Sequence, residues 1–331
     1  MAVTALNHPG QDNAAGDVLA NLKVIYSGLI ANQFQAGLKL GPTVTQRNFP
    51  RGAKQIELKF HDEETAVAHV PGEDIFIDGA YSGNPQKGSK VINLGAKLLK
   101  AGLLDEWEGY QEDFDSQRAH AMAIQAALRK ADEVNTFRAI VAAAVRNGGA
   151  DEYTNEPDLT GAVGTQTLAI GGAFNTTKAD LLRDFLYAAW SAFDQVDVPE
   201  EGRIFAIHPA HYPLLFMSTD KAFINRDYGN NNGSNASMET FLAAGFRVVK
   251  TSNIPKTDLT TPASKQTELD RDFSNTVGAC YHREAAVRSI AKDVKFEAGW
   301  DMRLQGNAYV ASMIAAYGSF RRECAIWLKH T

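Results

Sequence analysis

The chain has 331 residues, 44% of them hydrophobic and 22% charged, which is ordinary for a folded protein with two or three compact units. The formal net charge is −6 and no run of Lys or Arg exceeds two residues, which argues against a protein that grips nucleic acid through a basic stripe or arm. No segment approaches the roughly 20 apolar residues of a membrane span, and the N-terminus lacks the basic start and apolar core of a secretion signal.

The N-terminal region predicts one amphipathic helix. Residues 1–16 are small and polar, whereas Val18, Leu22 and Ile25 recur near the helical period after Asp17, which can cap the first turn. A helix with one apolar face must cover another surface. We therefore expect this segment to lie against another part of an assembly.

Residues 50–94 predict an extended hairpin. Apolar and polar side chains alternate over residues 55–60, as in a half-buried strand, and a second strand is predicted at residues 91–94. The stretch between them is polar and rich in Gly and Pro, and loops of this length are usually functional or disordered. Such a hairpin is too long and too polar to pack only on its own subunit.

The strongest local signal is a long helix over about residues 110–147. This stretch contains no Gly or Pro, and Gly148 and Gly149 follow it, as glycine commonly does after a helix. About 35 residues at 1.5 Å each make a rod of roughly 50 Å. The region around its start is acidic, with no intervening base, at Asp105, Glu106, Glu108, Glu112, Asp113 and Asp115. These acids favourably oppose the helix macrodipole; the alternative is an acidic patch that meets Arg or Lys on a neighbouring subunit.

A second helix and two strands predict a small α/β unit. Thr177 and Asp180 have the spacing of a capping box, and the core-facing side chains that follow are Leu182, Leu186, Ala189 and Phe193. We expect Pro199 and Gly202 to close this helix. Residues 204–207 and 248–249 are typical of buried strands, and the Asn- and Gly-rich residues 229–235 predict an exposed loop.

Further strands are predicted toward the C-terminus, at residues 277–281, 286–290, 294–296 and 309–317. We expect them to pair with earlier strands and to tie the C-terminus back to the long helix. Cys280 and Cys324 are the only cysteines of the sequence. Two isolated thiols fit a reducing cytoplasm, and we expect both to be buried.

No catalytic, cofactor-binding or metal-binding constellation is predicted. Residues 83–90 resemble a phosphate-binding loop in composition only, because Lys and Ser stand in the wrong order and a strand follows. The charge run at residues 61–64 favours a solvated stretch over a metal site, because adjacent strand residues point to opposite faces. His208, His211 and His282 leave a three-histidine zinc site open, and with it a soluble α/β hydrolase or metalloenzyme as an alternative function.

The order of the predicted elements resembles the HK97-like capsid fold of tailed bacteriophages: a long polar hairpin, a very long helix, a compact α/β insertion and returning strands. Local sequence is similar to the T7-like podovirus major capsid proteins at residues 203–212 (RIFAIHPAHY), 245–249 (GFRVV), 253–255 (NIP), 282–287 (HREAAV) and 317–323 (YGSFRRE). The preserved order along nearly the whole chain carries this resemblance. Residues 229–237 have no counterpart in that pattern.

The resemblance implies an α+β fold of five segments. These are an N-terminal arm (1–49), an extended loop (50–94), a peripheral domain with its spine helix (95–176), an axial domain (177–274), and return strands of the peripheral domain (275–331). It also implies a subunit without enzymatic activity or cofactor, which self-assembles into hexamers and pentamers of an icosahedral shell enclosing double-stranded DNA.

The implied partners are other copies of the chain, a scaffolding protein during assembly and a portal at one vertex, with no membrane. We expect the scaffolding protein to be separate, because residues 1–49 leave little room for a cleaved scaffold domain. The implied location is the virion, after assembly in the host bacterial cytoplasm.

Charge pairs are expected to place the extended loop on a neighbouring subunit. The candidate residues are Glu63, Glu64, Glu73 and Asp74 in the loop, with Arg47, Arg51 and Lys87 nearby. The negative net charge is compatible with a shell that must release its DNA, since basic surface would hold phosphates. An encapsulin-like compartment, which holds an enzyme instead of a genome, is the alternative function within the same fold.

Overall fold

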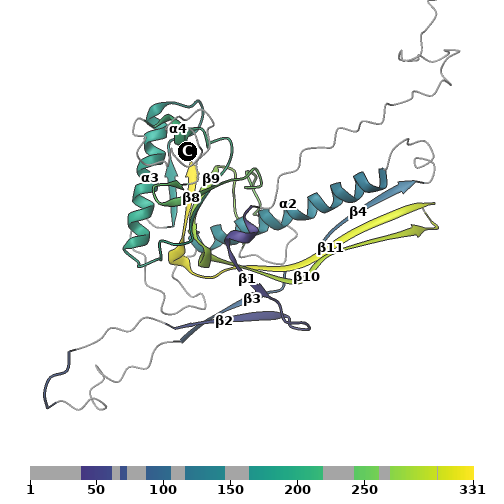
Figure 1. Cartoon of the computed structure of the whole chain (residues 1–331), viewed down its shortest axis with the longest axis horizontal. Helices are drawn as coiled ribbons and strands as arrows, with labels where there is room; N and C mark the ends of the chain where they lie inside the picture. The colour runs from purple at the N-terminus through teal and green to yellow at the C-terminus, as the bar shows by residue number, and fades with distance from the viewer. Residues whose placement is uncertain are drawn as a thin grey trace, which may run out of the picture.

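The computed structural model describes residues 39–61, 68–72, 87–105, 116–145, 164–218, 242–260, 269–303 and 305–331. Within these ranges the fold is mixed α+β, as predicted, with three β-sheets, two long helices and several short helical turns (Figure 1). None of the helices in these ranges is long and apolar enough to cross a membrane. The predicted N-terminal helix lies outside the described residues.

The long helix α2 (Ser116–Val145) runs along a four-stranded sheet (Figure 1). Its strand order is β1–β10–β11–β4, with bounds Thr45–Asn48, Ala286–Asp301, Gly306–Ser319 and Leu98–Asp105. Ile124 and Leu128 of the helix form one buried cluster with Tyr309 and Ala311 of β11. The predicted long helix is thus confirmed over α2, while residues 110–115 and 146–147 lie outside the described ranges.

The C-terminal part of α2 enters the main core, which is built on a six-stranded sheet. The strand order is β5–β12–β9–β6–β8–β7, with bounds Thr165–Leu168, Ala325–His330, Thr276–His282, Arg203–Ile207, Phe246–Lys250 and Leu242–Ala243. Every residue of β6 and β9 is buried. Because successive side chains of a strand point to opposite faces, both faces of the sheet are covered at its centre.

Helix α3 (Thr176–Asp194) packs into this core with the side chains predicted for it, but its N-cap is not the predicted one. Asn175 caps the helix, and its side-chain oxygen accepts a hydrogen bond from the backbone N–H of Lys178 at 2.8 Å. Thr177 lies inside the first turn, so the predicted capping box of Thr177 and Asp180 is wrong. The Asp180 carboxylate instead accepts a hydrogen bond from Ser218 Oγ at 2.7 Å. A short helix α4 (Leu214–Met217) follows β6.

The C-terminal strands are divided between the two larger sheets. β10 pairs with β11, and β11 pairs with β4 beside α2. β9 pairs with β12 and β6, and β12 also pairs with β5. Residues 275–331 therefore contribute strands to both larger sheets, and β12 of the six-stranded sheet also contacts α2. The predicted domain bounds stay a prediction. An apolar strand fits either sheet, and only long-range pairing selects one. The strands predicted at residues 286–290 and 294–296 are one strand, β10, whose pairing with β11 shifts register between them.

A third, two-stranded sheet is the predicted hairpin. β2 (Gln55–His61) and β3 (Lys87–Asn93) pair antiparallel, and the hairpin lies beneath the four-stranded sheet in Figure 1. Ile92 of β3 is 3% exposed and belongs to a buried cluster with Val287 and Ala316. A Cβ atom on Gly318 would lie 2.8 Å from the Ile92 side chain. Glycine at this position therefore permits the hairpin to approach β11 closely.

Candidate assembly surfaces

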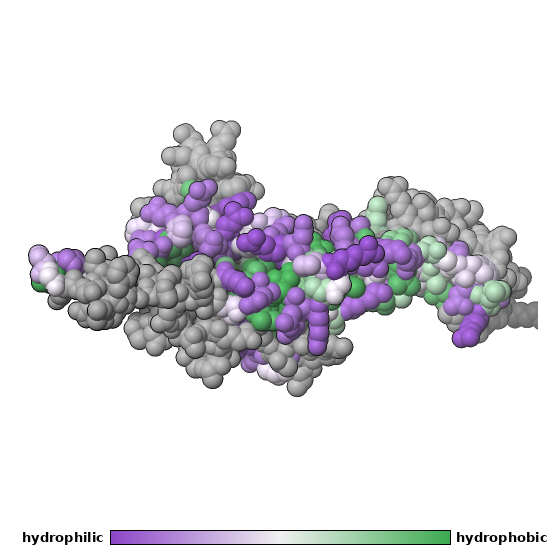
Figure 2. Space-filling model, turned by 90° about the horizontal axis from the view of Figure 1, so that it is seen from below, coloured by the Kyte–Doolittle hydropathy of each residue, from purple (hydrophilic) through white to green (hydrophobic). Residues whose placement is uncertain are grey.

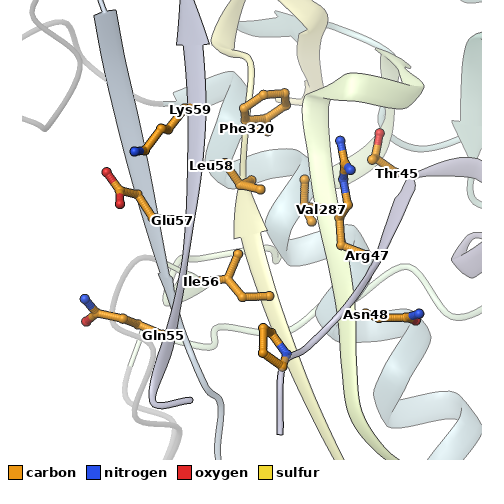
Figure 3. A pocket seen from close by; sticks show the side chains of 11 residues that line it. Thr45, Arg47, Asn48, Gln55, Ile56, Glu57, Leu58, Lys59, Val287 and Phe320 are labelled. Carbon is orange, nitrogen blue, oxygen red and sulfur yellow. The ribbon is translucent and has the colours of Figure 1, made fainter. Parts of the chain in front are cut away.

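A groove of about 510 Å³ lies at the root of the hairpin, between β1, β2 and the start of β10 (Figure 3). Ile56 and Leu58 point from β2 toward Val287 and Phe320, whereas Glu57 projects to the other side of the strand. The predicted alternation of β2 is confirmed for these residues. Seen from below, the middle of the molecule exposes a hydrophobic area flanked by hydrophilic side chains (Figure 2).

The structure places some of the residues predicted to position the loop. Arg47 lies on β1 with an exposed side chain, and its backbone carbonyl accepts a hydrogen bond from Ser289 Oγ at 2.9 Å. Arg51 is exposed in the turn that follows β1. Lys87 begins β3, but its side chain lies outside what is described, as do Glu63, Glu64, Glu73 and Asp74 altogether. Charge pairing between the loop and a neighbour therefore stays a prediction.

Within the residues that the structure describes, the outer half of β10 is an open sheet edge. Among the described strands, β1 pairs with β10 only from Val287 to Ile290, and from Lys292 to Asp301 the sole partner is β11. Most side chains in this outer half are exposed, including Phe296 at 44% and Trp300 at 48%. An unpaired edge that carries exposed aromatic residues is a ready surface for contact with another chain.

A buried ionic network joins α2 to the sheet that bears this edge. Asp132 is 1% exposed, and its carboxylate accepts hydrogen bonds from Arg288 Nε at 2.9 Å and Arg288 Nη2 at 2.7 Å. Tyr317 of β11 donates a third hydrogen bond at 2.5 Å. Burial and the Asp132 charge raise the pKa of Tyr317 far above its ordinary value, so the phenol stays protonated and able to donate. The two parallel hydrogen bonds between Asp132 and Arg288 fix the relative orientation of the two side chains. Together with the bond from Tyr317 they hold α2 against β10 and β11.

The next residue, Glu133, is fully buried and binds a different part of the molecule. Oε1 accepts hydrogen bonds from the backbone N–H groups of Lys39 and of Leu40, the latter at 2.9 Å. Oε2 accepts from the Asn253 side chain and from Thr251 Oγ1, the latter at 3.3 Å. Consecutive helical residues point about 100° apart, so Asp132 and Glu133 reach two different neighbours. Neither carboxylate was predicted as a buried contact from the sequence, although two adjacent acids just before an apolar helical run were an available signal.

The histidines considered for a zinc site do not meet. His208 and His211 follow the C-terminal end of β6, whereas His282 is paired with Arg203 at the N-terminal end of that strand. His282 Nε2 instead lies 3.0 Å from the backbone carbonyl oxygen of Glu201. Because strand residues advance by roughly 3.3 Å each, the register contradicts a site made of these three histidines.

His211 instead packs against His330, with ring centroids 5.6 Å apart. Its side chain is buried, and neither ring nitrogen has a hydrogen-bond partner among the described residues. Burial, with a smaller contribution from the Lys256 charge, lowers the pKa of His211 and of His208 to about 4. Both rings are therefore neutral at physiological pH: His211 is a packing group, whereas Nδ1 of His208 accepts a hydrogen bond from the backbone N–H of Ala210 at 3.1 Å.

Comparison with known proteins agrees with the capsid interpretation. The chain matches the sequence model of the Gp10A-like family, described as major capsid protein, over residues 62–329. It is similar to the capsid structure of Cyanophage P-SCSP1u, at 22% identity and a TM-score of 0.76 over 98% of this chain and 97% of that chain. It is also similar to the mature capsid of bacteriophage PhiM1, at 17% identity and a TM-score of 0.72 over 99% of this chain and 97% of that chain.

A third solved structure, from Mycobacterium phage Che8, is similar at 13% identity and a TM-score of 0.62 over 92% of this chain and 95% of that chain. No curated protein sequence matches the chain. At these identities the structural likeness shows the fold, while the family is shown by the sequence model, which spans most of the chain. The chain has the HK97-like capsid fold and belongs to the Gp10A-like family of major capsid proteins.

Proposed function

We propose that this chain is a structural subunit without catalytic role that self-assembles into the icosahedral shell of a tailed bacteriophage. The observation that carries the proposal is the edge of β10 from Lys292 to Asp301, which no other described strand covers and where Phe296 and Trp300 are exposed, in a chain of a major capsid family. The groove at the hairpin root is a second surface left open by the single subunit. Each contact that buries such a surface between two copies can be weak. Because every copy makes several of them, the assembled shell is stable through multivalency.

In this proposal the copies form hexamers and pentamers that enclose double-stranded DNA in the virion. A scaffolding protein guides assembly in the host bacterial cytoplasm, and a portal occupies one vertex. Sequence similarity at residues 203–212 supports a T7-like podovirus relationship. The net charge of −6 supports an inner wall that releases DNA, because counterion-dependent binding to phosphates requires a basic surface.

Electron microscopy tests the proposal directly. The chain is expressed alone and together with the scaffolding protein from the same genome, and the products are imaged by negative stain. Closed icosahedral shells, or rings of five and six subunits, are the expected products. A monodisperse monomer or dimer under both conditions would contradict the proposed function.

The proposal includes residues 1–49 as an arm and residues 50–94 as a loop that lies across a neighbour. Replacing Glu73 and Asp74 by Ala is expected to lower shell yield and the temperature at which shells dissociate, because the neighbour's cations lose their partners. The double variant Glu73→Asp with Asp74→Glu keeps both charges and is the matched control. Equal yield and equal dissociation temperature for the Ala variant and the wild type would sink the charge-pair proposal.

A further inference from the structure

A pocket of about 480 Å³ opens at the N-terminal end of β6, away from the hairpin groove. Its lining includes three arginines from different elements: Arg203 of β6, Arg247 of β8 and Arg283 of the turn η3 (Arg283–Ala285). Strand register brings them together, because Arg247 pairs with the residue after Arg203, and Arg203 pairs with the residue before Arg283. Residues far apart in sequence thus contribute three arginines to the lining of one pocket.

Arg203 is the buried member of this group. Its side chain is 1% exposed and its Nη2 forms an ion pair with Asp194 at 2.6 Å. Its Nη1 is buried and has no hydrogen-bond partner among the described residues. Its Nε and Nη2 also donate to the backbone carbonyls of Pro199 and Val198, so Arg203 forms a fixed wall of the pocket.

The other two arginines form the rim of the pocket. Arg247 and Arg283 are exposed, and neither forms an ion pair within the described ranges. The nearby carboxylate of Glu284 is engaged by Arg321, with 3.2 Å between Oε2 and Nε. Glu201 lines the pocket, and Asp194 balances Arg203. Among the described residues that line the pocket, the two exposed guanidinium groups of Arg247 and Arg283 therefore exceed the one carboxylate, Glu201, by one charge.

We propose that this pocket binds a carboxylate side chain of a neighbouring copy of the chain. A carboxylate matches the planar fork of a guanidinium and accepts two hydrogen bonds from it. A nucleic-acid strand fits less well, because it carries a row of phosphates and requires a basic stripe rather than a pocket with one missing charge. The proposal rests on the proposed function, since a second copy reaches the pocket in an assembled shell.

Charge balance over the whole chain supports a second copy as the occupant. Asp and Glu number 39 against 33 Lys and Arg, so every copy carries carboxylates that its own cations cannot all neutralise. The highest density of carboxylate side chains is in residues 105–115, a segment that contains no Lys or Arg. If an acid of one copy binds the arginine pocket of the next copy at every interface, the repeated contact would fix the angle between neighbouring subunits.

A cross-linking experiment identifies the occupant. The double variant Arg247→Lys with Arg283→Lys keeps the charge of the pocket and supplies primary amines. Shells assembled from equal parts of ¹⁵N-labelled and unlabelled variant subunits are treated with a zero-length carbodiimide, which joins an amine to a carboxylate in direct contact. Mass spectrometry is expected to find mixed-isotope peptides that link position 247 or 283 to an Asp or Glu of another copy.

The same reaction contains its own control, because Lys295 and Glu297 are in contact within one subunit and should be joined in every sample. Recovery of that internal link without any mixed-isotope link to position 247 or 283 would overturn the proposal. Links from these positions to Glu201 of the same chain alone would overturn it as well.

Removing the charges gives a second test. Shells of the double variant Arg247→Ala with Arg283→Ala are expected to dissociate at a lower temperature and a lower salt concentration than shells of the Lys variant. A loss confined to DNA-filled particles would assign the pocket to phosphates and overturn the proposal. If the Ala variant forms empty and DNA-filled shells as stable as those of the Lys variant, the pocket proposal is wrong and the proposed function still stands. If wild-type subunits form no shells, the proposed function is wrong, and the pocket proposal fails with it.

Discussion

The six-stranded sheet and the outer half of the four-stranded sheet contain similar strands but are completed in different ways. β6 and β9 are buried at every residue, between neighbouring strands of their own subunit. From Lys292 to Asp301, β10 is mostly exposed and pairs on one side only within the described part of the chain. The first region has a closed core, whereas the second offers apolar area and backbone hydrogen bonds to another chain. A shell subunit needs both a rigid body and open surfaces.

Helix α2 connects these two regions and shows the same contrast along its length. Around Ile124 and Leu128 only one face is buried, whereas every residue from Thr136 to Ala144 is buried. Asp132 and Glu133 stand where the first pattern gives way to the second. The buried carboxylates therefore hold together the closed core and the open sheet.

The largest effect is expected from breaking that connection. Asp132→Ala leaves the Arg288 guanidinium buried without its carboxylate, and removal of one partner of a buried ion pair costs about 3–5 kcal/mol. Urea unfolding of the isolated subunit measures the loss. The control is Asp293→Asn on the exposed part of β10, where surface substitutions stay within about 0.5 kcal/mol. Equal losses in the free energy of unfolding for the two variants would show that the ionic network does not stabilise the contact between α2 and the four-stranded sheet.

Two glycines give a direct comparison of the closed and open sheets. A Cβ atom on Gly278 of β9 would lie 2.1 Å from the carbonyl oxygen of Ala206, so Gly278→Ala must push β6 and β9 apart. Overpacking of this kind costs about 1–3 kcal/mol or more. Gly299→Ala on β10 meets no atom within 4 Å and should leave the free energy of unfolding nearly unchanged. Chemical denaturation of both variants checks the difference, and similar losses would contradict it.

A smaller effect is expected from acid, and it should be confined to the closed region. Burial and the nearby charges of Lys256, His330 and His208 lower the pKa of His211 from 6.5 to about 4. The folded state thus binds this proton more weakly than the unfolded state. The contribution is fully present above pH 6.5 and is lost as the pH falls toward 4.

Thermal melting of the subunit between pH 7 and pH 4 tests this linkage. The His211→Asn variant should lose less of its melting temperature over this interval than the wild type, because it has no imidazole to protonate. Parallel losses in the two proteins would mean that protonation of His211 does not limit stability in acid.

The smallest effect on the subunit, with the clearest effect on the shell, is expected at the open edge. Trp300→Ser with Met302→Ser alters side chains that are 48% and 80% exposed. The free energy of unfolding should change by no more than about 0.5 kcal/mol per site, whereas shell yield should fall because the contact with a neighbour loses apolar area. Light scattering during assembly measures the second effect. Normal assembly of this variant would argue that the outer half of β10 remains open in the shell.

Local patterns in the sequence were sufficient for the elements whose residues interact with near neighbours. Alternation in β2, the Gly- and Pro-free stretch of α2 and the apolar run of β6 predicted these elements, and the structure confirms them. Burial of the free thiols Cys280 and Cys324 also followed from their residue type and isolation. The capping box at Thr177 failed because Asn175, two residues earlier, is an equally good cap and begins the helix.

Only the tertiary structure decided which distant residues meet. β9 and β10 are both apolar at their start, yet one joins the closed sheet and the other the open sheet. Asp132 and Glu133 are neighbours in sequence, but the turn of the helix sends them to Arg288 and to Leu40. Arg203, Arg247 and Arg283 share a pocket only because strand register aligns them. Periodicity determines which face of an element is apolar, whereas pairing across many residues is selected by the total burial and hydrogen bonding of the whole fold.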